Sequence, residues 1–214
     1  KGIDLYGAEI NFNTVLKVGF PTGSSAICTF ENNDKTFIIA FDRTTAMIID
    51  VEENQRQLVR NLPDFGWVNV AYPTTFNGEK CILLGCDSGK IAVFYPNLLE
   101  DNPKRILVDT NIKSKDGIQS ILEIKQNGKI YYVFSNTDGW VFLYDCNNNE
   151  LLDPISICTD EERENVLNEW EKYNSKMIVA CRMDYDKSNN QVLISFGQKL
   201  YRMDLTTDCF DITE

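Results

Sequence analysis

The sequence of 214 residues predicts an all-β fold, a β-propeller or propeller fragment with about four four-stranded blades and one inserted amphipathic helix. A strand–turn–strand sequence pattern recurs with a spacing of roughly 45 to 60 residues, close to the length of a propeller blade. Each repeat also contains four short apolar runs separated by turn residues. The copies of this pattern can be aligned by matching Asp42 with Asp87, Gly89 with Gly139, and Asp145 with Asp204.

The segment 1–22 contains one strand-like run, residues 10–18, which Gly19 and Pro21 terminate. It precedes the first full repeat. In propellers an N-terminal strand of this kind often joins the last blade and closes the ring. We therefore expect the run 10–18 to be a ring-closing strand.

Each repeat is expected to form one antiparallel blade, in which a turn at 87–89 or 138–139 links the second strand to the third. Glycine supplies the positive φ that such a turn needs without steric cost. The last strand of the third repeat is expected at 151–157, and the first strand of the fourth at 177–183. The predicted blades are 23–64, 65–112, 113–158 and 175–214.

A helical pattern over residues 159–174 interrupts the series of strands. Thr159 and Glu162 form a capping box, which satisfies free N–H groups at the start of a helix. Val166, Trp170 and Tyr173 fall on one face at helical spacing. Two interpretations remain open, because this face either packs on the chain's own blades or docks a partner with Trp170 as the anchor.

The net charge of −11 indicates a surface that repels nucleic acid and anionic membrane, both of which require basic residues. Direct membrane insertion is not expected, because no apolar run approaches the ~20 residues that span a bilayer. The seven cysteines are odd in number, and the chain has no C-x-x-C pair and no Asn-x-Ser/Thr sequon. These features favour free thiols in the cytoplasm, with disulfides in a secreted protein as the alternative.

The absence of histidine excludes Ser-His-Asp and Cys-His catalysis and histidine ligation of metals. No phosphate-binding glycine loop is present, and no pair of acids has a recognisable glycosidase arrangement. We therefore expect a protein that is not an enzyme, with no catalytic residues and no cofactor.

One loop has oxygen ligands at alternate positions, as calcium loops do. Asp184, Asp186 and Ser188 occupy positions 1, 3 and 5 of this candidate loop. Lys187 places a positive charge inside it, and Val192 stands where an acid is expected. The prediction is a polar turn that binds no calcium, with a degenerate calcium loop as the alternative.

The segment 175–179, the candidate loop and the run 192–197 resemble an FG-GAP repeat of the integrin-alpha type. The phrases around Gly89 and 138–140 are also similar to divergent intracellular FG-GAP repeats of the kind found in the KICSTOR complex. That resemblance implies a seven-bladed propeller and a role in an assembly that tethers a nutrient-signalling GTPase regulator to lysosomes. WD40 repeats are the rival family, since 144–145 is similar to their Trp-Asp strand end.

The function expected from these features is a non-enzymatic propeller scaffold that mediates protein–protein interaction in a multi-subunit complex, with nutrient signalling as the suggested setting. The alternative is a secreted or surface propeller of the adhesion type, which binds a receptor or ligand. Four blades make only an arc of a seven-bladed ring, so both ends are expected to expose apolar faces. Further sequence or another chain would then complete the ring.

Overall fold

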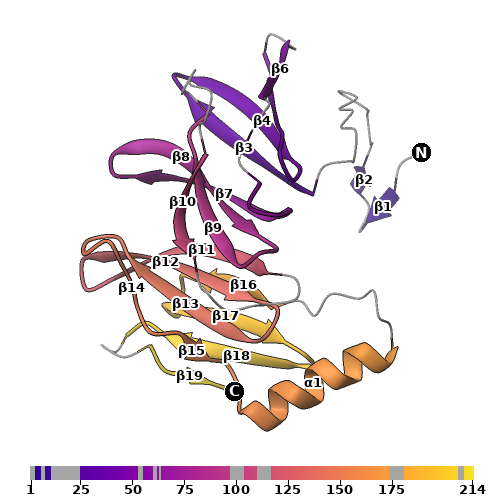
Figure 1. Cartoon of the computed structure of the whole chain (residues 1–214), viewed down its shortest axis with the longest axis vertical. Helices are drawn as coiled ribbons and strands as arrows, with labels where there is room; N and C mark the ends of the chain where they lie inside the picture. Colours follow the sequence, from indigo (N-terminus) through magenta and orange to yellow (C-terminus); the bar gives the residue numbers. More distant parts are fainter. Residues whose placement is uncertain are drawn as a thin grey trace.

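The computed structural model describes residues 3–5, 8–10, 25–52, 55–59, 62, 64–96, 104–109, 117–173, 181–206 and 210–214. Apart from one helix, the regular structure of these residues is all β (Figure 1). Four antiparallel sheets follow one another along the chain, and a separate strand pair lies near the N-terminus. The all-β prediction is therefore confirmed.

Each sheet is built from consecutive strands. Sheet 1 contains β3 (Ala26–Asn32), β4 (Lys35–Phe41), β5 (Ala46–Asp50) and β6 (Gln55–Val59). Sheet 2 contains β7 (Val68–Phe76), β8 (Glu79–Cys86), β9 (Lys90–Phe94) and β10 (Lys104–Asp109). Sheet 3 contains β11 (Ile118–Gln126), β12 (Lys129–Asn136), β13 (Trp140–Asp145), β14 (Glu150–Leu151) and β15 (Ile155–Ser156). Sheet 4 contains β16 (Arg182–Asp186), β17 (Gln191–Phe196), β18 (Lys199–Asp204) and β19 (Ile212–Thr213).

The strand order within each sheet follows the chain, as the repeated pattern predicts. The turns at 87–89 and 137–139 link β8 to β9 and β12 to β13, and both pairs are antiparallel. Gly89 and Gly139 have φ values of 78° and 74°, which glycine adopts without strain. The predicted linkage of the second strand to the third is confirmed for both turns.

Two boundaries differ from the sequence prediction. The strand expected at 151–157 is divided into β14 and β15, which both pair with β13. Pro154 lies in the break, where it has no N–H to donate to a ladder. The strand β16 runs on to Asp186, so Asp184 and Asp186 belong to a strand and not to a loop.

The sheets are stacked face to face, as the ribbon shows (Figure 1). The first strands lie next to one another in the order β3, β7, β11 and β16. Three apolar cores fill the spaces between successive sheets, and each combines side chains of two neighbours. Sheets 2 and 3 are therefore apolar on both faces, which explains the continuous apolar runs of β8 and β12.

The outer face of sheet 1 is apolar. The adjacent side chains of Ile27, Ala40 and Met47 form one cross-strand row on this face. Ala40 and Met47 are buried, whereas 65% of Ile27 is exposed. The row is apolar, as expected for this end, but Ile27 is its exposed residue.

The outer face of sheet 4 is polar, which corrects the expectation for the other end. Asp184, Leu193 and Arg202 form a row on this face, and both charged residues are exposed. Burial alternates along β17 and, from Leu200 onward, along β18, so each strand has one buried side only. This alternation is typical of a sheet with one solvated face.

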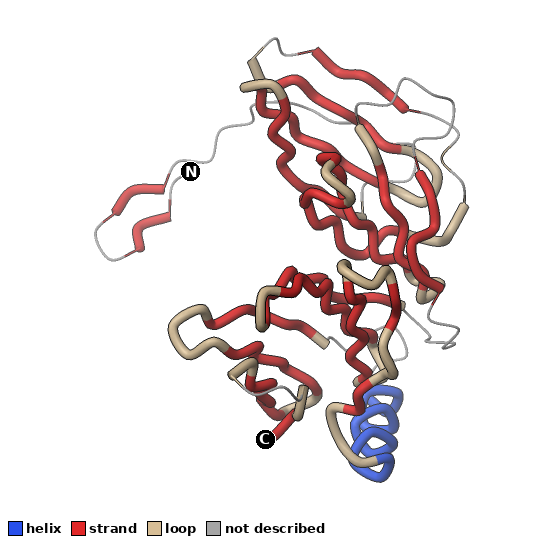
Figure 2. Tube along the Cα trace, turned by 90° about the vertical axis from the view of Figure 1, so that its left-hand side faces the viewer, coloured by secondary structure: helices blue, strands red, loops and turns tan. Residues whose placement is uncertain are grey.

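The N-terminal strands β1 (Ile3–Leu5) and β2 (Ala8–Ile10) pair antiparallel with each other. The pair stands apart from the four sheets in both views (Figures 1 and 2). Of the expected ring-closing strand 10–18, Ile10 belongs to β2 and the rest lies outside the described residues. Ring closure by this strand stays a prediction.

Candidate functional site

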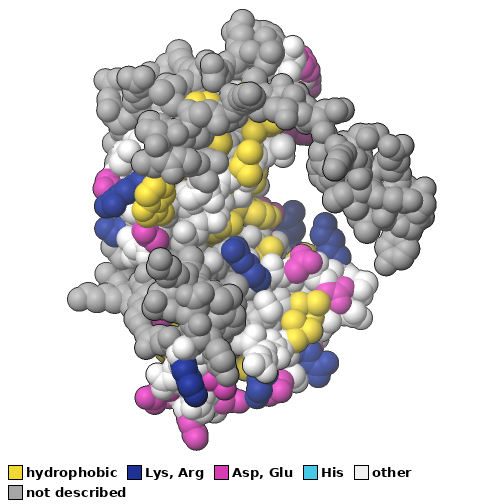
Figure 3. All heavy atoms as spheres, turned by 90° about the vertical axis from the view of Figure 1, so that its right-hand side faces the viewer, with side chains coloured by type: hydrophobic (Ala, Val, Ile, Leu, Met, Phe, Trp, Pro, Cys, Tyr) yellow, Lys and Arg dark blue, Asp and Glu magenta, His cyan; other side chains and the backbone are white. Residues whose placement is uncertain are grey.

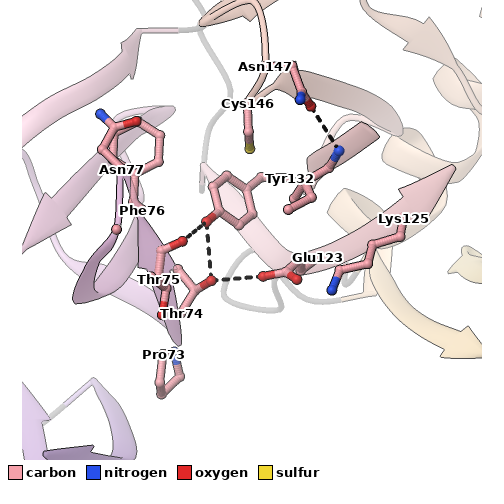
Figure 4. Close-up of a pocket in the computed structure, with 12 residues that line it drawn as sticks. Pro73, Thr74, Thr75, Phe76, Asn77, Glu123, Lys125, Tyr132, Cys146 and Asn147 are labelled. Carbon is pink, nitrogen blue, oxygen red and sulfur yellow. Dashed lines mark hydrogen bonds between the residues drawn. The ribbon is translucent and has the colours of Figure 1, made fainter. Parts of the chain in front are cut away.

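A recess of about 640 Å³ opens between sheets 2 and 3 (Figure 4). One wall is the end of β7 with the turn into β8. The other wall combines β11, β12 and the residues after β13. The lining residues are Pro73, Thr74, Thr75, Phe76, Asn77, Gly78, Glu123, Lys125, Ile130, Tyr132, Cys146 and Asn147.

Strand register places the polar side chains of sheet 3 on the wall that faces sheet 2. Glu123 pairs with Tyr132 across β11 and β12, and Lys125 pairs with Ile130. Side chains two residues apart on a strand share a face, so both rows face the same way as Ile121 of the core between sheets 2 and 3. The recess lies where this face extends past that core.

A hydrogen-bond network joins the two sheets at the bottom of the recess (Figure 4). The Thr74 hydroxyl donates to Glu123 Oε2 at 2.9 Å and lies 3.1 Å from the Tyr132 hydroxyl. Tyr132 donates its own proton to the Thr75 carbonyl at 3.0 Å. Behind this network, the Glu123 amide donates to the Tyr72 hydroxyl at 3.3 Å. Glu123 is thereby held in a fixed orientation.

Burial makes the thiol and phenol of this wall weaker acids than they are in water. It raises the pKa of the Cys146 thiol to about 11, and it also raises the pKa of the Tyr132 hydroxyl. The nucleophilic form of cysteine is the thiolate, so Cys146 is a poor nucleophile in this setting. The groups present suit hydrogen bonding and ion pairing with a bound molecule.

The helix α1 (Asp160–Tyr173) is the second candidate site. Arg163 is its principal attachment, because only 11% of that side chain is exposed. Arg163 Nε donates to the Asp138 carbonyl at 2.7 Å, and Nη2 donates to the Ser156 hydroxyl. The guanidinium also lies 4.5 Å from the centre of the Trp140 ring. These contacts fix α1 to sheet 3 by hydrogen bonds and a cation–π interaction.

The first turn of α1 has the predicted capping box. The Thr159 hydroxyl accepts from the Glu162 amide at 3.2 Å, and the Thr159 amide donates to Glu162 Oε2 at 3.1 Å. Lys199 of sheet 4 donates to Glu162 Oε1 at 2.8 Å and to Glu214 at 2.7 Å. The hydrogen bond from Lys199 and those from Thr159 lower the pKa of Glu162 to about 2. The helix is thus attached to sheet 4 as well.

Of the three candidate docking residues, Val166 packs within the chain. It is half buried against the core between sheets 3 and 4, and it lies beside Gly197 in the turn from β17 to β18. A Cβ at Gly197 would lie 2.8 Å from Val166 Cγ2, so glycine permits the close approach. The side chains of Trp170 and Tyr173 lie outside the described residues.

Asp186 of the candidate calcium loop caps the turn that follows β16. Its Oδ1 accepts from the Ser188 amide at 3.0 Å, and its Oδ2 accepts from Asn189 Nδ2 at 2.7 Å and Gln191 Nε2 at 3.0 Å. Hydrogen bonds from the Ser188 hydroxyl and from the side chains of Asn189 and Gln191 lower the pKa of Asp186. Asp184 points to the exposed face of sheet 4. Within the described residues, no three Cys, Asp or Glu side chains are grouped as a metal site would require.

The recess was not predicted from the sequence. Glu123 and Lys125 lie in a strand that otherwise looks like an apolar core strand. Charged residues at alternate positions of such a strand are the signal that could have indicated it. The packing of two sheets, which the chain pattern does not contain, brings Thr74 to Glu123.

No family model matches the chain, and no curated protein matches it. Among solved structures, the crystal structure of the computationally designed Ika8 protein is similar at a TM-score of 0.49 and 15% sequence identity. The similarity covers 84% of this chain and 45% of the designed chain, so this chain spans less than half of that protein. Among the described residues, no helix is long and apolar enough to cross a membrane.

Proposed function

We propose that the chain is a non-enzymatic β-propeller, or a segment of one, that acts as a scaffold in a multi-subunit protein complex. The propeller assignment is supported by four antiparallel sheets of consecutive strands whose first strands lie side by side. Stacking of this kind presents loops and edges of several sheets to partners without requiring a catalytic centre.

The observation that carries the scaffold function is the attachment of α1. The helix interrupts the repeat, and buried Arg163 and the pair Glu162–Lys199 fix it to two sheets. Its outward residues are polar and mainly acidic, and Figure 3 shows charged side chains of both signs over this end of the molecule. A helix that is held rigidly and projects from a scaffold loses little entropy when a partner binds. The exposed residues are Asp160, Glu161, Glu164, Asn165, Asn168, Glu169 and Lys172.

We propose further that the complex is intracellular and belongs to nutrient signalling. This part rests on the resemblance to divergent FG-GAP repeats. Cysteine usage supports a reducing compartment, because six described cysteines are free thiols, and burial raises the pKa of Cys181, Cys81 and Cys28 among them. Mass spectrometry after thiol labelling of the native protein tests whether the cysteines are free, and paired cysteines would favour the secreted alternative.

Quantitative co-purification tests the scaffold function. Native complexes are isolated with the wild-type chain and with a variant that carries Glu161→Lys, Glu164→Lys and Glu169→Lys on the outward face of α1. We expect the wild-type chain to co-purify with other subunits in stoichiometric amounts, and we expect the variant to lose these subunits. The matched control reverses three exposed acids of sheets 1 and 2, Glu31, Glu52 and Glu79, and should retain them. Partners that are absent from the wild type, or equally retained by both variants, would contradict α1 as the docking element.

A further inference from the structure

Two opposite charges lie next to each other on the sheet 3 wall of the recess without forming an ion pair. Glu123 and Lys125 project from the same side of β11 (Figure 4). Positions two residues apart on a strand are separated by roughly 7 Å. Among the described residues, no salt bridge within 4.0 Å includes Lys125. The ammonium group is exposed and available to a bound anion.

The two charges differ in how they are held. Thr74 fixes one oxygen of Glu123, so that carboxylate is oriented before anything binds. Lys125 has a flexible stem and can follow a ligand. Beside it, Asn147 uses Oδ1 to accept the Ile130 amide at 3.1 Å, which leaves its Nδ2 group as a further donor at the rim. The recess therefore offers one fixed acceptor for a cation and two donors for an anion.

The apolar part of the wall lies between these polar groups. Phe76 comes from sheet 2, and Ile130 and Cys146 come from sheet 3. Ile130 and Cys146 are half buried, so part of each remains open to contact. A ligand with a short apolar side chain would cover this surface while its charged groups meet Glu123 and Lys125.

We propose that the recess binds a small zwitterion of the free α-amino-acid class, with its ammonium group on Glu123 and its carboxylate on Lys125. A ligand with a positive charge alone is repelled by Lys125, and one with a negative charge alone is repelled by Glu123. The two charges of an α-amino acid are only a few ångströms apart, which suits residues at alternate strand positions. The volume of about 640 Å³ admits the side chain and ordered water.

This binding function goes beyond the scaffold function and does not depend on it. The recess lies between sheets 2 and 3, whereas the proposed docking element is α1. Loss of partners in the α1 variant therefore says nothing about the recess, and ligand binding at the recess can be measured on the isolated chain.

The test is a titration of the ¹⁵N-labelled chain with free L-amino acids, followed by nuclear magnetic resonance. We expect saturable shifts of the backbone amides of Glu123, Lys125, Ile130 and Asn147. The N-acetyl derivative of the same amino acid lacks the ammonium group, and the carboxamide derivative lacks the carboxylate. Each should bind about tenfold more weakly, because a hydrogen bond to a charged group is lost.

Two variants separate recognition from folding. Lys125→Met removes an exposed charge, and Glu123→Gln retains an oxygen that can accept from Thr74. Each should weaken binding about tenfold and leave thermal unfolding unchanged. Lys172→Met, at the exposed end of α1, is the matched control and should bind as the wild type does. The absence of saturable shifts, equal binding of the derivatives, or full binding by both recess variants would each overturn the proposal.

Discussion

At the scale of single residues, Arg163 connects α1 to several separate parts of the described structure. Its side chain contacts the Asp138 carbonyl, Ser156, Asp160 and the Trp140 ring, and it is nearly buried. The planar guanidinium can donate in several directions at once, which an ammonium group cannot do. The sequence shows an ordinary charged helix residue at this position, because nothing along the chain indicates that the turn at 137–139 lies beneath it.

Arg163→Met should therefore lower the free energy of unfolding by about 2 to 3 kcal/mol, since the partly buried carbonyl and hydroxyl partners lose a charged donor. Arg163→Lys should recover less than half of this loss. Urea denaturation measures both effects. The exposed Lys172→Met serves as the control with little change, and a loss below 0.5 kcal/mol (about the size of a surface effect) for Arg163→Met would contradict the role of this side chain.

The capping residue Glu162 predicts a specific dependence on pH. Its pKa is lowered from 4.5 to about 2 by Lys199 and Thr159. A carboxylate with a lowered folded-state pKa stabilises the fold above its unfolded-state pKa, and this contribution disappears as the pH falls through the folded-state value. The wild type should be more stable than Glu162→Gln at neutral pH, and this difference in stability should disappear between about pH 4.5 and pH 2. Thermal melts of both proteins across this range measure the difference, and an advantage that persists at pH 2 would refute the assignment.

At the scale of elements, the hairpins were predictable and the site was not. Glycine-containing turns between apolar runs determine their own strand pairing locally, which is why the Asp-Ser-Gly turn at 87–89 and the Asp-Gly turn within 137–139 are placed correctly. The sequence predicts a loop at Asp184 because oxygen-bearing side chains recur there at alternate positions, as they do in calcium loops. The solvated face of sheet 4 accommodates Asp184, and only the packing of sheets reveals which face is solvated. The same dependence on packing concealed the recess around Glu123.

The turns differ in how much space surrounds them, and this predicts unequal responses to alanine. Gly78 and Gly139 both have positive φ, so an alanine at either position costs about 1 to 2 kcal/mol of backbone strain. A Cβ at Gly78 meets nothing within 4 Å, whereas one at Gly139 would lie 2.9 Å from the Phe196 ring. Gly139→Ala should therefore destabilise the protein more than Gly78→Ala by at least 1 kcal/mol (about the cost of overpacking). Chemical denaturation of the two variants measures this difference, and equal losses of stability would exclude the steric contribution of Phe196.

At the scale of the whole molecule, the two ends of the stack have opposite chemistry. Sheet 1 has an apolar row on its outer face in which Ile27 is exposed, whereas the outer face of sheet 4 carries exposed charged residues. The succession of face-to-face sheets can continue beyond sheet 1 with the same kind of contact, and sheet 4 has no apolar face left to offer. We expect the chain to associate through the sheet 1 end, with an interface above about 2,000 Å² in total.

Two matched substitutions test whether the chain associates through sheet 1 and not through sheet 4. Ile27 on sheet 1 and Leu200 on sheet 4 are both large apolar residues, 65% and 60% exposed. Light scattering should give the wild-type chain a mass above the 24.5 kDa of one copy. Ile27→Asp should reduce that mass to the monomer, and Leu200→Asp should leave it unchanged. A monomeric wild type, or dissociation by Leu200→Asp alone, would be inconsistent with association at sheet 1.

The order of strands within the sheets also has a consequence for synthesis of the chain. Every four-stranded sheet is complete within one short, continuous stretch of sequence. Contacts between residues close in sequence form quickly, because little loop-closure entropy is lost. Each sheet can therefore form as soon as its last strand leaves the ribosome and then serve as the surface on which the following sheet assembles. Sheets 2, 3 and 4 thus each cover the facing apolar side of the sheet before them soon after it appears.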